Sequence, residues 1–207
     1  MAPIERKKLD LGPLKSANVP VFFIIGGPGC GKGTQCEFMV RDFGLSHLSS
    51  GDLLRDEVKS GSARGSQLNE MMEKGELVPL EVVLDLLAEA MLREVAKGSK
   101  GFLIDGYPRE VKQGDQFEAE VVPATLAIYF HVSDEIMTER LLNRAKTSGR
   151  VDDNIDTIKK RLLTFNTATQ PVVAHYKGKD KLAHIDAVGS KDEVYAQVKP
   201  IMEKYFK

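Results

Sequence analysis

The sequence predicts an α/β fold in which helices flank a parallel sheet. Short apolar runs alternate along the chain with segments of helical periodicity, and this alternation is typical of parallel sheets covered on both faces. In addition, the stretch "GGPGCGKGTQC" follows the first apolar run and precedes a helical segment. A glycine-rich turn between a strand and a helix is typical of phosphate-binding loops. The two observations together predict a P-loop type of α/β sheet.

Four strands are expected from the apolar runs. The run "VFFII" at residues 21–25 is continuous and is bounded by a proline and a glycine, as in a strand buried on both faces of a parallel sheet. Three further runs of this kind predict strands at residues 102–104, 126–132 and 182–186. Their spacing leaves room for a helix in each connection, which parallel strands require.

Helices are expected in those connections. Apolar residues at helical spacing from Leu80 to Leu87 predict an amphipathic helix, and Ser190 with Glu193 forms a capping box for a final helix. Further helices are predicted at residues 32–43, 134–143 and 155–165.

Three segments do not fit a packed core. Residues 1–18 show no clear periodicity and are expected to form a loosely held arm before a single domain at residues 19–207. Residues 49–78 are helical in pattern but polar and interrupted by glycine, and residues 143–153 are expected to form a short polar loop. We expect the latter two segments to be flaps over a site, and to move most when ligand binds.

The composition of the whole chain excludes several classes of protein. The net charge of −1 argues against the strongly basic surface of a nucleic-acid-binding domain, and no apolar run approaches the 18 residues of a membrane span. The two cysteines, Cys30 and Cys36, are too few for a disulfide framework. A cytoplasmic enzyme that acts on small molecules, without nucleic-acid or membrane partners, is therefore the expected class.

The glycine-rich turn is a variant of the Walker A loop. Gly26, Gly31 and Lys32 fit the pattern G-x-x-x-x-G-K, but the next position, which usually carries a magnesium-binding hydroxyl, is Gly33, and the hydroxyl follows on Thr34. Backbone N–H groups of such a loop, together with the helix N-terminus, favour phosphate, and Lys32 adds a full positive charge.

The substitution at position 33 changes the expected metal site. With no side chain after the lysine, Mg²⁺ is expected to be held by nucleotide phosphates and waters rather than directly by the protein. Asp105, directly after the strand predicted at residues 102–104, is expected to act on that ion through water.

Six arginines are placed where they suit phosphate binding. Arginine pairs with phosphate in bidentate geometry, and ligands of open α/β sheets bind at the carboxyl ends of the strands. The six are Arg55, Arg109, Arg140, Arg144, Arg150 and Arg161.

The ordered motifs "GGPGCGKGTQC", "HLSSGDLLR", "KGELVP", "GFLIDGYPRE" and "SGRVDDN" resemble the adenylate kinase family of nucleoside monophosphate kinases, in its short-lid form. The resemblance implies a five-stranded parallel sheet, a helical AMP-binding flap at residues 49–78 and a short lid at residues 143–153. It also implies the reaction ATP + AMP ⇌ 2 ADP with Mg²⁺, in a monomer.

The resemblance also implies roles for individual residues. The catalytic residues are expected to be Lys32, Arg109, Arg144, Arg150 and Arg161. ATP is expected to contact Gly29, Cys30, Gly31, Lys32, Gly33, Thr34, Arg140, Arg144 and Gly189. AMP is expected to contact Ser50, Arg55, Leu77, Val78, Gly106, Tyr107, Arg109, Gln113, Arg150 and Arg161.

The predicted lid contains no cysteine or histidine, so no lid zinc is expected. The four histidines of the chain are interpreted as structural or surface residues.

Three alternative functions share some of these features. A UMP/CMP kinase would share the loop and the arginines, but Gln113 can pair with the edge of adenine, and Ser50 stands where the pyrimidine-specific relatives tend to have alanine. A switch GTPase would need Ser or Thr at position 33 and an N-K-x-D motif, and the chain has neither. A non-catalytic nucleotide-binding scaffold is disfavoured because the set of cations is intact.

Overall fold

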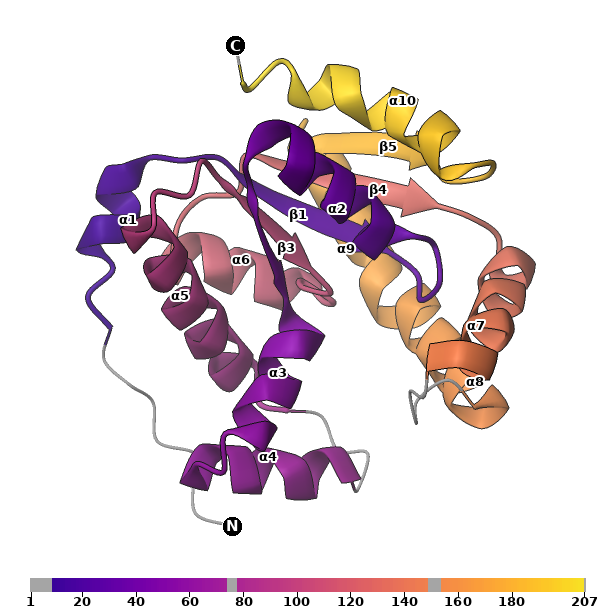
Figure 1. Ribbon diagram of the computed structural model, residues 1–207, viewed down its shortest axis with the longest axis horizontal. Helices are drawn as coiled ribbons and strands as arrows, with labels where there is room; N and C mark the ends of the chain where they lie inside the picture. Colours follow the sequence, from indigo (N-terminus) through magenta and orange to yellow (C-terminus); the bar gives the residue numbers. More distant parts are fainter. Residues whose placement is uncertain (1–8, 74–77, 149–153, 207) are drawn as a thin grey trace.

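The computed structural model describes residues 9–73, 78–148 and 154–206, and its centre is one parallel sheet (Figure 1). Five strands form this sheet in the order β2-β3-β1-β4-β5, and every neighbouring pair is parallel. The strands are β1 (Val21–Gly26), β2 (Ser46–Ser49), β3 (Phe102–Asp105), β4 (Leu126–His131) and β5 (Leu182–Asp186). The predicted α/β fold with a parallel sheet is confirmed.

The strand β2 is the one that the apolar runs did not predict. Its sequence, "SHLS", alternates instead of running continuously, and only Leu48 is buried. The pattern is weak because β2 lies at the edge of the sheet and is paired on one side only, with β3.

Helices cover both faces of the sheet. On one face lie α2 (Lys32–Phe43) and α10 (Lys191–Met202), which pack against each other; on the opposite face lie α5 (Leu80–Ala96), α6 (Val111–Glu120) and α9 (Gln170–Gly178) (Figure 1). The helix α2 has the predicted bounds because a glycine with left-handed backbone stands at each end, Gly31 before it and Gly44 after it. The predicted capping box of Ser190 and Glu193 starts α10.

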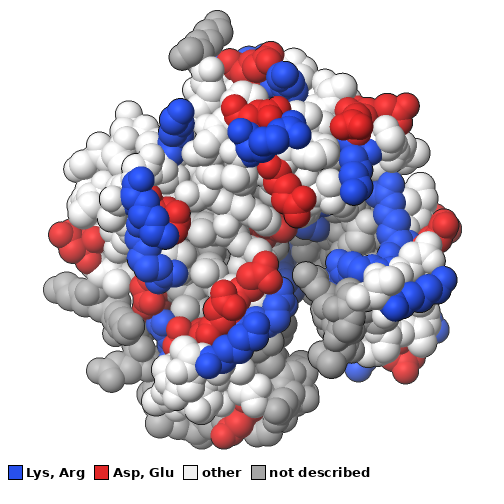
Figure 2. Space-filling view, viewed as in Figure 1, with Lys and Arg blue, Asp and Glu red and all other residues white. Residues whose placement is uncertain are grey.

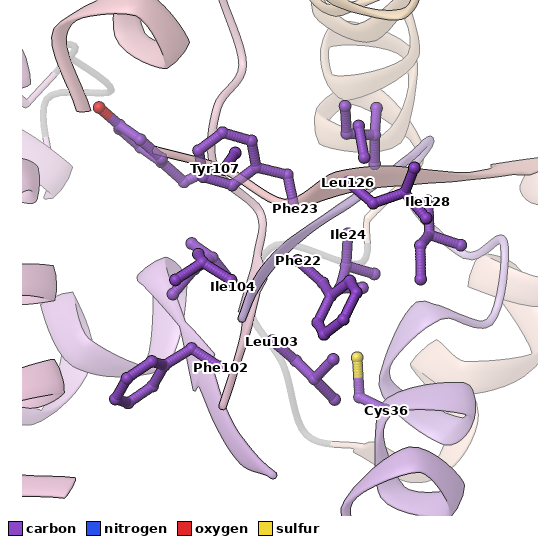
Figure 3. Packing of buried hydrophobic residues seen from close by; sticks show 14 of the residues in the cluster. Phe22, Phe23, Ile24, Cys36, Phe102, Leu103, Ile104, Tyr107, Leu126 and Ile128 are labelled. Carbon is purple, nitrogen blue, oxygen red and sulfur yellow. The ribbon is translucent and has the colours of Figure 1, made fainter. Parts of the chain in front are cut away.

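The core is built on β1, whose residues 21–25 are all buried. On the side of α6 and α9, the fully buried Phe23 makes edge-on ring contacts with Phe117, at 5.1 Å between ring centroids, and with Tyr176, at 5.6 Å. On the side of α2, the buried Cys36 directs its sulfur toward the sheet beside Leu103 (Figure 3). A continuous apolar strand is therefore needed at this position, since both faces are covered.

The segment predicted as a helical flap contains α3 (Ser50–Lys59) and α4 (Ala63–Glu73). A small apolar cluster, separate from the main core, joins these helices to the start of α5; its buried members are Leu68, Val82 and Leu86. Arg64 of α4 adds two ion pairs, each 3.0 Å long, to Glu57 of α3 and Glu89 of α5. The α3–α4 unit thus rests mainly on α5, and only α3 also contacts the sheet, at β2.

The prediction of a polar loop from residue 143 was wrong for its first half. The helix α7 (Asp134–Ser148) continues through residues 143–148. These residues include the good helix formers Arg144, Ala145 and Lys146, so that propensity outweighs the polar character that suggested a loop. Residues 149–153 lie outside the described part of the chain.

The helix predicted along residues 155–165 was also incomplete. The helix α8 (Ile155–Thr164) passes through one π-helical turn, η1 (Phe165–Thr169), directly into α9. Such turns are often found at functional sites. Here the turn places Thr169 so that its hydroxyl donates to the carbonyl of Arg109, at 3.0 Å.

The prediction of a loosely held arm at residues 1–18 was wrong where the structure describes it. The helix α1 (Gly12–Ala17) packs beside α5 (Figure 1), and Leu14, 2% exposed, belongs to the main core. The segment is too short to show periodicity, so one buried leucine left no readable pattern.

Candidate nucleotide-binding site

The candidate site lies where two neighbouring strands end and their connections diverge. In β1 and β3, Ile24 pairs with Asp105, so the two carboxyl ends lie side by side. The chain leaves β1 toward α2 on one face of the sheet and leaves β3 toward α6 on the opposite face. In open α/β sheets this divergence opens the crevice in which ligands bind.

A cleft of about 830 Å³ occupies this position, and we call it the central cleft. Figure 2 shows the molecule hollowed between its α3–α4 side and its α7–α8 side, with lysine and arginine side chains along the hollow. Twelve of the residues predicted to form the site line the central cleft: Gly29, Gly31, Lys32, Gly33, Thr34, Arg55, Asp105, Gly106, Arg109, Arg140, Arg144 and Arg161. The structure therefore gathers cations from five segments of the chain around one space.

Two glycines allow the loop to make its turn. Gly29 has φ +82° and Gly31 has φ +99°, a backbone conformation that other residues rarely adopt. A Cβ on Gly29 would also lie only 2.9 Å from the side chain of Leu141 on α7. Gly33 is different, because among the described residues no atom beyond its chain neighbours and the backbone of its own helix lies within 4 Å of the place where its Cβ would be. The fold itself does not need a glycine there, so any need for one must come from a ligand in the cleft.

Lys32 is held by its own loop. Its Nζ donates to the carbonyls of Gly26, at 2.7 Å, and Gly27, at 2.9 Å, and lies 3.6 Å from the sulfur of Cys30. Carbonyl oxygens are weaker partners for an ammonium group than phosphate oxygens are. The lysine is thus oriented at the cleft and can exchange neutral partners for an anion.

Arg140 braces the loop from α7. Its guanidinium donates to the carbonyl of Cys30 and to the carbonyl of Ala187, each at 3.2 Å. These contacts tie the loop after β1 to the connection between β5 and α10. Arg140 also lines the central cleft, so its charge faces the ligand space while its hydrogen bonds set the shape of the loop.

Arg109 is fixed by three neighbours. Its Nε donates to the carbonyl of Gly106 at 3.0 Å, its backbone N–H donates to the Gln113 Oε1 at 2.7 Å, and its carbonyl accepts from Thr169. Arg109, Arg161 and Lys32 also line a smaller pocket of about 210 Å³ beside the central cleft. A positioned arginine next to the loop lysine is what a second phosphate group would need.

The carboxylate predicted to act near a metal is Asp105, and it has a close histidine neighbour. The Nε2 of His47 lies 3.4 Å from the Asp105 Oδ2. Burial alone raises the pKa of Asp105, but the contact with His47 and the positive charges of Lys32 and Arg109 outweigh it, so that this pKa lies below its usual value. Asp105 is therefore an anion at neutral pH and faces the cleft.

Several predicted residues do not line the central cleft. Ser50 is buried and its hydroxyl donates to the carbonyl of Gly106, whereas Tyr107 is buried in the core and its hydroxyl donates to the carbonyl of Gln113. Cys30 is buried under its loop. The others not on the cleft wall are Val78, Gln113 and Gly189. Leu77 and Arg150 lie outside the described residues.

Seven residues on the cleft wall were not singled out from the sequence as site residues: Pro28, Glu37, His47, Ser49, Gly51, Asp52 and Leu141. Four of them lie in or directly after β2, the strand that the apolar pattern missed. His47 in particular was interpreted as a structural or surface residue, yet it lies beside Asp105 in the cleft. Recognising "SHLS" as an edge strand was the signal that could have placed them.

No helix among the described residues is both long and apolar enough to cross a bilayer.

The comparisons with known proteins agree with this geometry. The family model described as "Adenylate kinase" matches residues 24–181. A Caenorhabditis elegans protein named adenylate kinase isoenzyme 1 is 63% identical over 205 residues, covering 99% of this chain and 98% of its own. The human adenylate kinase isoenzyme 1 is 56% identical over 89% of this chain and 94% of its own, and adenylate kinase 1 of Schistosoma mansoni is 56% identical over 92% and 96%.

Proposed function

This chain belongs to the adenylate kinase family of phosphotransferases, and we propose that it carries out its reaction in the central cleft. The reaction is the transfer of the γ-phosphate of ATP to AMP, which yields two molecules of ADP. The observation that supports this location is that the phosphate loop, Lys32 and five arginines from other segments of the chain line one space between α3 and α7.

The two nucleotides are assigned to opposite ends of the cleft. ATP phosphates bind the loop and the N-terminus of α2, where Lys32 replaces its carbonyl partners with phosphate oxygens. AMP binds on the side of α3, with Arg55 and the braced Arg109 on its phosphate. Arg144 and Arg161 face the space between them. Leu77 and Arg150, outside the described residues, remain assigned to AMP by the family resemblance.

The chemistry needs little besides position and charge. The attacking oxygen of AMP is already largely ionised near neutral pH, so no general base is required. The two nucleotides repel each other, and the fixed cations offset that repulsion and stabilise charge on the transferred group. Because α6, the residue that follows β3 and the π-helical turn hold Arg109 in place, little reorganisation is needed when the phosphates meet.

The residues present fit a magnesium ion held mainly by phosphates and water. Position 33 offers open space in place of a hydroxyl ligand, and the ionised Asp105 faces the same cleft. Asp105 would hold the ion through its water ligands, and the ion would neutralise charge on the phosphates. Arg140, by bracing the loop, keeps the phosphates aligned with that carboxylate.

Closure of the cleft is proposed to exclude water, which competes with AMP as acceptor. The α3–α4 unit and the last turns of α7 contribute residues to the cleft wall. Residues 49–78 are assigned as the AMP-binding flap and residues 143–153 as the lid. The chain is proposed to act as a cytoplasmic monomer on ATP, AMP and ADP, with no nucleic-acid or membrane partner.

The acceptor is tested by product formation from ATP with AMP, UMP or CMP at equal concentration. AMP is expected to be strongly preferred, and comparable rates with UMP would contradict the assignment. The matched control is Lys32→Met, which keeps the length of the side chain and removes its charge. This variant is expected to stay folded and to lose at least about 10²-fold in turnover, as other losses of transition-state charge stabilisation do.

A further inference from the structure

Three potential metal ligands converge at the floor of the central cleft. They are the Sγ of Cys36 on α2, a ring nitrogen of His47 on β2 and a carboxylate oxygen of Asp105 at the end of β3. All three atoms lie within 4.8 Å of one another. No other group of three or more His, Cys, Asp or Glu ligands at this spacing occurs among the described residues.

The histidine at this cluster has a long contact with the Asp105 carboxylate and no hydrogen bond that the structure describes. Its Nε2 is inaccessible to solvent and makes no hydrogen bond with any residue that the structure describes, although the Asp105 Oδ2 is 3.4 Å away. A buried nitrogen left in this state is costly, and such atoms call for an explanation. An ion bound by both groups would supply one, because two bonds of about 2 Å in tetrahedral geometry place their ligand atoms roughly 3.4 Å apart.

The donor set selects a particular class of metal. Thiolate, imidazole and carboxylate together suit zinc and its analogue cobalt, whereas Mg²⁺ avoids sulfur and nitrogen. Three protein ligands with a fourth position open to water is also the arrangement of many zinc sites. The open direction exists here, because His47 and Asp105 line the central cleft while Cys36 closes the floor behind them.

We propose that Cys36, His47 and Asp105 form a binding site for Zn²⁺ or Co²⁺ at the floor of the central cleft. On binding, the Cys36 thiol releases its proton to solvent as its sulfur bonds to the ion, and the donor atoms draw together by up to about 1 Å. The nearby charge of Lys32 opposes the ion, so the site is weaker than a structural zinc site and takes zinc reversibly. Zinc bound here occupies Asp105 and inhibits the kinase; the inhibition, unlike the binding, rests on the proposed function.

The site is tested with Co²⁺ added to the full chain, after treatment with chelator and without nucleotide or Mg²⁺. One equivalent is expected to bind and to give a near-ultraviolet charge-transfer band of a cobalt–thiolate bond, which Zn²⁺ then removes by displacement. Cys36→Ser is expected to abolish the band. His47→Asn is expected to weaken binding by at least about tenfold, since even residues that only support metal ligands contribute that much.

The matched controls are Cys30→Ser, at the other cysteine of the chain, and His184→Gln, at an exposed histidine. Both are expected to keep the band and the affinity of the unchanged chain. Because Cys36 is fully buried, its variant could unfold; the second measurement is therefore thermal unfolding of His47→Asn with and without Zn²⁺. Zinc is expected to raise the Tm of the unchanged chain by mass action and not that of His47→Asn.

The proposal is overturned if no thiolate band forms, if the band survives Cys36→Ser, or if it is lost in Cys30→Ser. An equal rise in Tm of His47→Asn and the unchanged chain would also overturn it. If the band forms as expected but zinc leaves turnover unchanged, the site stands and the placement of the reaction beside Asp105 is wrong. The experiment therefore tests the metal site and the proposed function independently of each other.

Discussion

Replacing Leu68 by alanine should loosen the α3–α4 unit and leave the rest of the molecule intact. Leu68 is fully buried, and it belongs to the small cluster with Val82 and Leu86 and not to the main core. A buried leucine reduced to alanine costs about 3 kcal/mol. Because the cluster joins only α3, α4 and the start of α5, that cost falls on local opening of this unit.

The expected size of the effect follows from that cost. A loss of about 3 kcal/mol raises the opening equilibrium by about 10²-fold, so amide hydrogens of α4 should exchange about 10²-fold faster. The KM for AMP should rise because the proposed flap is less often in its binding-competent form. The KM for ATP, which is assigned to the loop after β1, should stay within about twofold.

The matched control is Leu87→Ala. Leu87 lies on α5, next to Leu86 in sequence, and it is equally buried, but it belongs to the main core. The same loss of side chain there should lower the Tm by roughly 6–12 °C and speed exchange throughout the sheet. Uniform exchange in Leu68→Ala, or an equal rise in both KM values, would refute the idea that the α3–α4 unit is held separately.

Three further predictions concern other parts of the chain. Gly33→Ala should keep the free energy of unfolding within about 1 kcal/mol, because its Cβ meets no side chain that the structure describes, yet raise the KM for ATP. An unchanged KM would show that the space beside position 33 is not used. Arg64→Met should lower the free energy of unfolding, measured in urea, by about 3 kcal/mol, because the guanidinium that bridges α3 and α5 is mostly buried. A loss below about 1 kcal/mol would show that these ion pairs do not stabilise the fold. Asp42 has a pKa lowered to about 2 by hydrogen bonds from Arg41 and Tyr195, so it stabilises the fold fully above about pH 4 and loses this effect as the pH falls through 2. The difference in unfolding free energy between the unchanged chain and Asp42→Asn should therefore be largest above about pH 4 and close toward pH 2, and a gap independent of pH would contradict the assignment.

Local signals predicted most of the sheet and the phosphate loop. Strand β1 was readable because burial on both faces demands a continuous apolar run, and α2 was readable because left-handed glycines bound it. The edge strand β2 escaped because pairing on one side only leaves its residues half polar. The bounds of α7 were missed because a charged, exposed helix and a polar loop have similar composition.

The sequence predicted which cationic residues belong to the site but not which atoms they contact. Lys32 and the arginines follow from motifs that each occupy a short stretch of sequence. The bracing of Arg140 depends on carbonyls 110 and 47 residues away, and the meeting of Cys36, His47 and Asp105 depends on three separate elements. Contacts of that range are set by the packing of the whole sheet, and no local pattern carries them.

The helix α7 packs closely on the glycine-rich turn, so a small tilt of the helix at the turn moves its far end by a larger distance. Its residues Met137, Arg140 and Leu141 contact the turn, and from Met137 the helix runs on for 11 residues to Ser148. At 1.5 Å per residue this arm is about 16 Å long, so a tilt of about 10° at the turn displaces its far end by about 3 Å. A small adjustment of the backbone around a bound phosphate is thereby amplified at the remote tip of the helix.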